Sequence, residues 1–141
     1  MPWCANDVSK LQVSSYVLDA SALLCLINGE PGAEKVHRAL KHSSISVVNV
    51  SEVIAKRIDF GDAPDLLIKD IADLELTIVD MNFSQAAWAG RMRAQTRAIG
   101  LSLGDRACLA LAKTLGAIAL TSDRAWLAIA SEVGVSVELV R

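Results

Sequence analysis

Short apolar runs alternate along the chain with longer segments of helical period. Runs of strand length occur at 16–19, 45–48, 76–79, 117–120 and 135–140. The segments between them have helical spacing and carry capping residues and closing glycines. This alternation is typical of a parallel sheet that is covered on both faces by helices. We therefore predict a three-layer α/β/α fold around a central, mostly parallel sheet of four to five strands.

The same pattern predicts where the helices begin and end. After the first strand a helix should end at Gly29, and Pro31 should open another. Asn49 and Glu52 have the spacing of a capping box, which would start a helix directly after the run 45–48. One long helix is expected over 83–99.

Length and composition indicate one folded domain. The chain has 141 residues, of which 52% are hydrophobic and 21% charged, so a disordered chain is excluded. We expect an N-terminal extension over 1–15 and the domain over 16–141. The net charge of −2 gives no general affinity for nucleic acid, so any such binding must come from a local basic patch or from bound metal.

The cysteines and the first residues favour a cytoplasmic protein. Cys4, Cys25 and Cys108 are widely spaced and form no C-x-x-C pair, which argues against a disulfide framework or a thiolate zinc site. The N-terminus has neither the basic start nor the apolar centre of a signal peptide. The longest apolar run, 17–27, is broken by Asp19 and is too short to span a bilayer.

Four acids are predicted to meet at one edge of the sheet. Asp19, Glu52 and Asp123 each follow the end of a predicted parallel strand. Asp105 begins the helix that leads back into the strand 117–120, so the start of that helix lies at the same edge. Strand ends and helix starts converge there, and ligands bind at this edge in open parallel sheets.

Each acid alone is explained by helix capping, which stabilises a helix by about 0.3 to 1 kcal/mol. Capping does not explain why all four share one edge, where uncompensated carboxylates repel each other. A divalent cation resolves the conflict, and all-oxygen ligands suit Mg²⁺ or Mn²⁺ rather than zinc. His37 and His42 are five residues apart, do not share a helix face and are expected at the surface. Such ions commonly support phosphodiester hydrolysis.

The chain resembles PIN-domain ribonucleases, specifically VapC-type toxins of type II toxin–antitoxin pairs. The resemblance covers about residues 16–140. It rests on four segments in a fixed order: Val17-Leu18-Asp19-Ala20-Ser21-Ala22-Leu23, Asn49-Val50-Ser51-Glu52-Val53, Leu101-Ser102-Leu103-Gly104-Asp105-Arg106-Ala107-Cys108-Leu109-Ala110, and Thr121-Ser122-Asp123-Arg124-Ala125-Trp126. Gly104 stands where the family often has Ala, and we expect it to weaken the helix start slightly.

The resemblance implies that Asp19, Glu52, Asp105 and Asp123 are catalytic and bind Mg²⁺ or Mn²⁺. Asp19 and Asp105 are the first choices for direct ligands, while Glu52 and Asp123 bind directly, through water or at a second metal. The resemblance also assigns supporting roles to further residues, although turn hydroxyls and exposed arginines are equally ordinary. These are Ser21, Thr121 and Arg106.

The resemblance further implies single-stranded or loop RNA as substrate, a homodimer and a small antitoxin that covers the acidic site. Candidate RNA-binding residues are Arg91, Arg93, Arg97 and Arg124, although a solvated helix face explains them equally well. The antitoxin groove would come from apolar helices, in which core packing is the commoner use of each side chain. Those side chains are Leu23, Leu24, Ile27, Leu40 and Ile54.

Three other functions compete with this interpretation. One is a catalytically weak PIN-fold module that binds RNA or protein. A phosphoacceptor receiver domain would need an acidic pair after its first strand and a Lys after its last, which this chain lacks. A phosphatase with an aspartyl nucleophile would need Asp-x-Asp where this chain has Asp19-Ala20-Ser21.

Overall fold

Five short parallel strands form one sheet in the computed structural model, which describes residues 14–141. Their order across the sheet is β3-β2-β1-β4-β5, so β1 is central. The strands are β1 (Tyr16–Leu18), β2 (Ser43–Ser46), β3 (Thr77–Val79), β4 (Ile118–Thr121) and β5 (Val137–Leu139). The register pairs Leu18 with Ile45 and with Leu120, so the carboxyl ends of the three middle strands are level. The predicted parallel sheet is confirmed, and it is parallel throughout.

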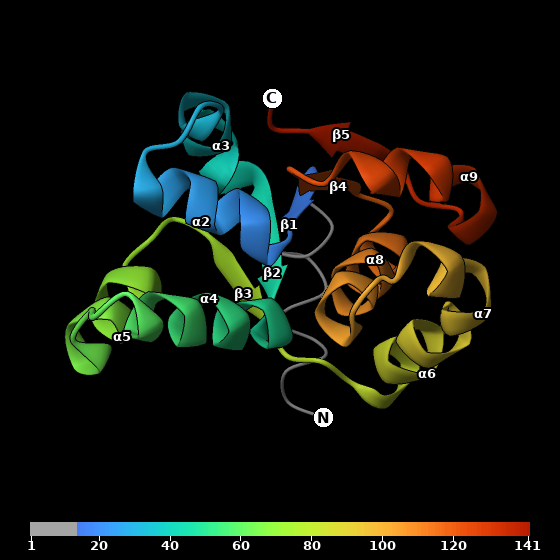
Figure 1. Ribbon diagram of the computed structural model, residues 1–141, viewed down its shortest axis with the longest axis horizontal. Coiled ribbons are helices and arrows are strands. Elements are labelled where there is room, and N and C mark those ends of the chain that lie inside the picture. The colour runs from blue at the N-terminus through green and yellow to red at the C-terminus, as the bar shows by residue number, and fades with distance from the viewer. Residues whose placement is uncertain (1–13) are drawn as a thin grey trace.

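Helices cover both faces of the sheet (Figure 1). On one side lie α2 (Ala20–Asn28), α3 (Ala33–Ala39), η1 (Leu40–His42), α4 (Val47–Asp59) and α5 (Pro64–Ala72). On the other lie α6 (Phe83–Arg91), α7 (Arg93–Thr96), η2 (Arg97–Ile99), α8 (Leu103–Leu115), η3 (Arg124–Ala128) and α9 (Ala130–Val133). The three-layer α/β/α arrangement is therefore confirmed.

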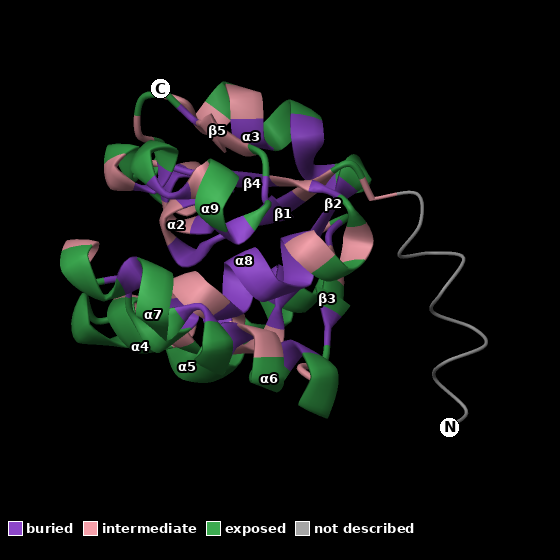
Figure 2. Ribbon diagram, turned by 90° about the vertical axis from the view of Figure 1, so that its right-hand side faces the viewer, coloured by how far each residue is buried: buried purple, intermediate pink, exposed green. Residues whose placement is uncertain are grey.

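Two hydrophobic cores, one on each face, hold the layers together. Leu18 on β1 belongs to the core that includes side chains of α2 to α5, whereas its neighbour Val17 belongs to the core formed with α8 and Trp126, because successive strand residues point to opposite faces. Helix α8 is the most enclosed helix, with most of its ribbon in the buried colour (Figure 2). Buried apolar side chains of this kind stabilise a domain by about 1.5–3 kcal/mol each.

Three of the predicted boundaries are wrong. Pro31 does not open α3, which starts at Ala33 with Gly32 as its N-cap. Helix α4 starts at Val47, inside the predicted strand, because the Ser46 side chain caps it by accepting from Val48 N at 3.2 Å. Asn49 therefore lies within the helix and is not its cap. The predicted helix over 83–99 is broken after Arg91, where the Thr96 hydroxyl donates to the Met92 carbonyl at 2.9 Å, a contact that bends helices.

The N-terminal extension predicted over 1–15 lies almost wholly outside the described residues. None of the helices in 14–141 is long and apolar enough to cross a membrane.

Candidate metal centre

Asp19 is the most deeply placed of the four predicted acids. It follows β1, caps α2 and is only 3% exposed. Its Oδ1 accepts from the Ser21 hydroxyl at 2.7 Å and from Ala22 N at 2.8 Å. Its Oδ2 accepts from the Thr121 hydroxyl at 2.6 Å. The carboxylate is thus fixed between the ends of β1 and β4.

Burial raises the pKa of Asp19 from 3.8 to about 6, although the bonds from Thr121, Ser21 and Ala22 lower it. The negative charge of Asp105 raises this pKa further. A carboxylate that is hard to ionise despite three hydrogen bonds lies in a place where a positive charge would be stabilising.

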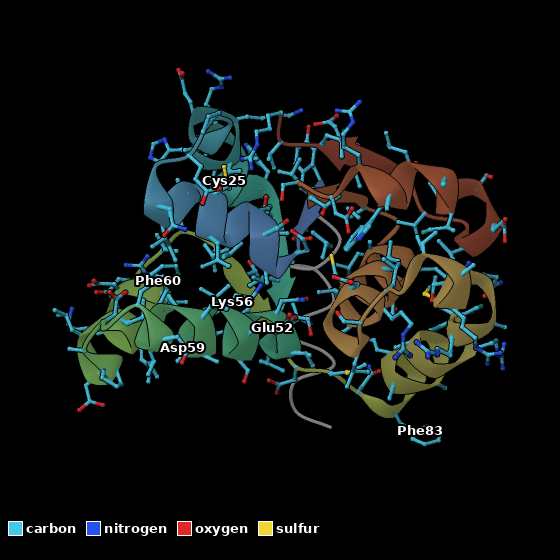
Figure 3. All side chains as sticks on the ribbon, in the orientation of Figure 1. Cys25, Glu52, Lys56, Asp59, Phe60 and Phe83 are labelled. Atoms are coloured by element: carbon cyan, nitrogen blue, oxygen red, sulfur yellow. The ribbon has the colours of Figure 1, made fainter. Side chains whose placement is uncertain are left out.

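Glu52 lies one turn into α4, at the end of the helix that faces α8, with Lys56 one turn further along (Figure 3). It is half-buried, and its Oε1 accepts from Asn49 Nδ2 at 3.0 Å. Desolvation raises the pKa of Glu52, and the charge of Asp105 adds to this effect, while Asn49 and Lys56 lower it.

Asp105, the third residue of α8, forms a capping box with Ser102. Its backbone N donates to the Ser102 hydroxyl at 3.2 Å, and its Oδ2 accepts from Ser102 N at 2.9 Å. Asp105 is therefore held at the helix start, where its charge acts on both Asp19 and Glu52.

Asp123 follows β4 and caps η3, but it is exposed. Its Oδ1 accepts from Ala125 N at 3.0 Å, and its backbone N donates to the Thr121 hydroxyl at 3.1 Å. Its charge is not among those that shift the pKa of Asp19 or Glu52. Asp123 is linked to Asp19 through Thr121.

Three of the four acids thus form one electrostatic cluster, which we call the acidic corner: Asp19, Glu52 and Asp105. The Cys108 thiol lies beneath it, with a pKa well above 9.0 because of burial and then of these three charges. Within residues 14–141, however, no three His, Cys, Asp or Glu side chains converge closely enough to hold a metal ion as they stand. Each carboxylate is turned toward its own hydrogen-bond donors.

The donor chemistry of the acidic corner nevertheless fits a hard divalent cation. Glu52 and Asp105 each use one carboxylate oxygen in the hydrogen bonds described, and Oδ2 of Asp19 accepts a single bond. Each carboxylate therefore retains lone pairs for a ligand. Oxygen-rich sites of this kind suit Mg²⁺ or Mn²⁺.

The predicted basic residues lie apart from the acidic corner. Arg106 donates from Nη1 to the Ala89 carbonyl at 2.8 Å, which ties α8 to α6. Arg91 stacks over Trp88 at 5.2 Å. The remaining three are exposed and form no ion pair with another described residue: Arg93, Arg97 and Arg124.

Two residues beside Glu52 have contacts that the sequence did not indicate. Asn49 is 1% exposed and donates from Nδ2 to the Gly104 carbonyl at 3.0 Å as well as to Glu52. Gly104 has no side chain, and the Glu52 carboxylate occupies the space where a Cβ would lie. The expectation that Gly104 merely weakens the helix start was therefore incomplete. The sequence shows only an Asn three residues before the acid, which equally fits a capping box, so it carried no signal for these contacts.

Comparison with known proteins identifies the family. The family model of the PIN domain matches residues 16–132. No curated protein matches the chain significantly.

Several solved structures have the same fold at low sequence identity. A chain of the DNA-bound VapBC complex from Salmonella typhimurium superposes with a TM-score of 0.70 at 18% identity, over 91% of this chain and 99% of that one. FitAcB from Neisseria gonorrhoeae superposes with a TM-score of 0.67 at 15% identity, over 86% of this chain and 95% of that one. PAE2754 from Pyrobaculum aerophilum superposes with a TM-score of 0.59 at 20% identity, over 82% of this chain and 84% of that one.

Proposed function

The chain belongs to the PIN domain family, as its sequence predicts, and from this premise we propose that it is a Mg²⁺- or Mn²⁺-dependent endoribonuclease. PIN domains are typically metal-dependent nucleases. The observation that carries the proposal is the state of Asp19, which is buried at the carboxyl edge of the sheet with a pKa raised to about 6 and a second acid acting on it. Buried carboxylates with a raised pKa are found preferentially at functional sites, because their charge is used there.

In this proposal Asp19 and Asp105 bind the ion directly. Glu52 and Asp123 bind it directly, through water or at a second ion. The bound ion would lower the pKa of an attacking water and stabilise the charge that develops on the phosphate. The chain's own contribution is to bring the acids to one corner before the ion arrives, and the carboxylates would then turn to meet around it.

Ser21 and Thr121 hold Asp19 in place. Their hydroxyls donate to different oxygens of the same carboxylate, and Ser21 also accepts from Ser122 N at 2.9 Å. The plane of the carboxylate is therefore set by one hydroxyl from the first turn of α2 and one from the end of β4. Hydrogen bonds of this kind around a ligand orient it and are commonly worth 10- to 100-fold in metal affinity.

The RNA would be held by the side of the molecule formed by α6, α7 and η2. The stretch 81–104 contains no acidic residue and three exposed arginines, Arg91, Arg93 and Arg97. A side of this kind offsets the overall charge of −2 and attracts a polyanion. Arg124 would add to it beside Asp123, whereas the bond of Arg106 to Ala89 favours a role in holding α6.

We further propose that the nuclease acts in the cytoplasm as the toxin of a toxin–antitoxin pair and forms a homodimer. Similar folds occur in a toxin–antitoxin complex from Klebsiella pneumoniae, at 19% identity and a TM-score of 0.64. Of the side chains predicted for the antitoxin groove, Leu23 is buried in the core, whereas Ile27 lines an apolar groove of about 360 Å³. This groove lies at the end of α2 away from Asp19, and its lining includes Leu66 and Ile71 of α5 as well as Asp62 and Asp70. A small antitoxin helix with basic and apolar side chains fits a groove of that composition.

One observation favours the alternative of a catalytically weak PIN-fold module that binds RNA or protein. No three potential ligands converge within 14–141, so an ion would have to draw the side chains out of their present contacts. Breaking one capping contact costs about 0.5–2 kcal/mol, which the binding of the ion would have to offset.

The test is to incubate the purified protein with total RNA, with and without Mg²⁺ or Mn²⁺, and to map the fragment ends by sequencing. The proposal expects discrete, metal-dependent cuts that disappear in Asp105→Asn. A folded, metal-binding and antitoxin-free protein that leaves the RNA intact would support the binding module instead.

A further inference from the structure

The contact between α4 and α8 includes two features that capping and packing leave unexplained. The first is the Asn49 amide. Nδ2 donates at 3.0 Å both to Glu52 Oε1 and to the Gly104 carbonyl, so the amide joins the two helices. Its Oδ1 is buried and finds no hydrogen-bond partner among the described residues. A buried polar atom without a partner weakens a fold.

The second feature is Gly104 itself. It lies in the first turn of α8, where the absence of a side chain lowers helix propensity. An added Cβ would collide with Glu52 Oε1 and would lie 2.5 Å from Glu52 Cδ. The backbone of Gly104 does not need a glycine, because the positive φ angles occur at other glycines. The glycine is therefore matched to the Glu52 carboxylate.

The unpaired oxygen of Asn49 and the low helix propensity of Gly104 each destabilise the protein locally, and a common substitution at either position would remove the destabilisation. An apolar residue at position 49 would leave no unpaired oxygen, and Ala at position 104 would favour the helix. What the two residues share is one carboxylate. Asn49 holds it from α4, and Gly104 leaves the space that it occupies against α8, next to Asp105.

We propose that Asn49 and Gly104 are positioning residues that fix the Glu52 carboxylate against the first turn of α8, ready for the metal ion. The inference rests on the proposed metal-dependent function and adds to it a reason why Glu52 stands beside Asp105. Neither residue touches substrate or metal; both act through Glu52.

The decisive variant is Gly104→Ala. Because the atoms that a new Cβ meets belong to the end of a flexible side chain, Glu52 moves and the fold stays. The melting temperature is expected to remain or rise, as helix propensity improves, while the affinity for Mn²⁺ measured by calorimetry falls about 10-fold. Gly90→Ala on α6 is the matched control, since a Cβ there meets nothing within 4 Å, and it should leave Mn²⁺ affinity unchanged.

Asn49→Ala should likewise weaken Mn²⁺ binding, by about 10-fold. Its control is Asn82→Ala, which removes the cap that accepts from Gln85 N at 2.8 Å and should lower the melting temperature without changing Mn²⁺ affinity. In a Glu52→Gln background neither Gly104→Ala nor Asn49→Ala should cause further loss, because both act through that carboxylate. An equal further loss there would overturn the proposal.

A readout without metal separates this proposal from the nuclease itself. The side-chain amide resonances of Asn49 in a ¹⁵N–¹H spectrum should shift in Gly104→Ala and in Glu52→Gln, but not in Gly90→Ala. Unmoved resonances would overturn the placement of Glu52. Shifted resonances in a protein that binds no Mn²⁺ would overturn the proposed function and, with it, the purpose assigned to this contact.

Discussion

Asp19 and Asp123 have the same local chemistry but different surroundings. Each follows the end of a parallel strand, each has an extended backbone, and each caps the helical turn that comes next by accepting from a backbone N–H. Asp19 is 3% exposed at the end of the central strand, between α2 and β4, whereas Asp123 is exposed beside η3.

The difference shows that burial, and not the sequence motif, decides at which acid the negative charge is poorly stabilised by the protein and by water. In the metal-free protein the Asp123 carboxylate is satisfied by its cap and by water, because it is exposed. Asp19 accepts the same kind of capping hydrogen bond, and its pKa is still raised to about 6. The acidic corner is therefore the part of the edge where a cation gains most.

The largest expected effect comes from neutralising each acid in turn. Asp19→Asn should reduce RNA cleavage by more than about 100-fold, since even changes around a ligand cost 10- to 100-fold. Asp123→Asn should reduce it less. Both keep a capping side chain, so circular dichroism should show intact folds. Initial rates of RNA cleavage at saturating Mn²⁺ compare each variant with the wild type. A larger loss in Asp123→Asn than in Asp19→Asn would contradict the greater importance given to the buried acid.

The second prediction concerns pH and stability without metal. Because the folded pKa of Asp19 lies above the unfolded value of 3.8, the folded state binds more protons between these pH values. The free energy of unfolding should therefore fall as pH rises from about 4 to above 6, by about 3 kcal/mol at roughly 1.4 kcal/mol per pH unit. Glu52, whose pKa is also raised, contributes with the same sign.

Denaturant titrations at pH 5 and pH 7.5 in EDTA measure the part of this loss that falls above pH 5, which is about 1.4 kcal/mol for Asp19. Mn²⁺ at pH 7.5 should restore the stability, and Asp19→Asn should be much less sensitive to pH. A metal-free wild type that is equally stable at both pH values would show that burial does not disfavour the charge of Asp19.

The parallel sheet and the common edge at which the acids lie could both be predicted, because each follows from local sequence patterns alone. Apolar runs mark strands, and parallel strands end at the same side, so the sequence alone was enough to group Asp19, Glu52 and Asp105. Burial could not be placed in this way. Asp19 and Asp123 look alike in sequence, and only the sheet order puts one at the centre.

The wrong boundary at β2 has a related cause. Ser46 and Asn49 are both good caps, and local spacing to Glu52 favoured Asn49. The structure uses Ser46 as the cap because Asn49 is taken up by the contact with Gly104 on α8. A contact between residues 55 apart in sequence has no local signal.

The third prediction tests the hydroxyls around Asp19. Thr121→Val keeps the shape but removes the buried donor to Oδ2, and should lower the free energy of unfolding by about 1–3 kcal/mol at pH 7.5. Ser21→Ala should cost less, because Oδ1 keeps its bond from Ala22 N. Thr114→Val on α8 is the control, since its hydroxyl bonds only within its own helix, to Ala110 O at 2.9 Å. Equal effects at positions 121 and 114 would contradict the role given to Thr121.

The smallest expected effect lies outside the acidic corner. Arg93→Ala or Arg97→Ala should raise KM for RNA a few-fold with kcat unchanged. Each should also reduce the salt dependence of RNA binding by about 0.7 in the log–log slope if the side chain meets one phosphate. Arg38→Ala, which breaks an exposed pair with Glu34 on α3, is the control. An unchanged slope would show that α7 and η2 do not contact RNA.

The most direct test of the metal centre is anomalous diffraction from crystals soaked in Mn²⁺. We expect a peak bounded by Asp19 and Asp105, with the Glu52 carboxylate turned toward it. Crystals without such a peak, or with Mn²⁺ bound only at acids elsewhere on the surface, would contradict a metal centre at the acidic corner.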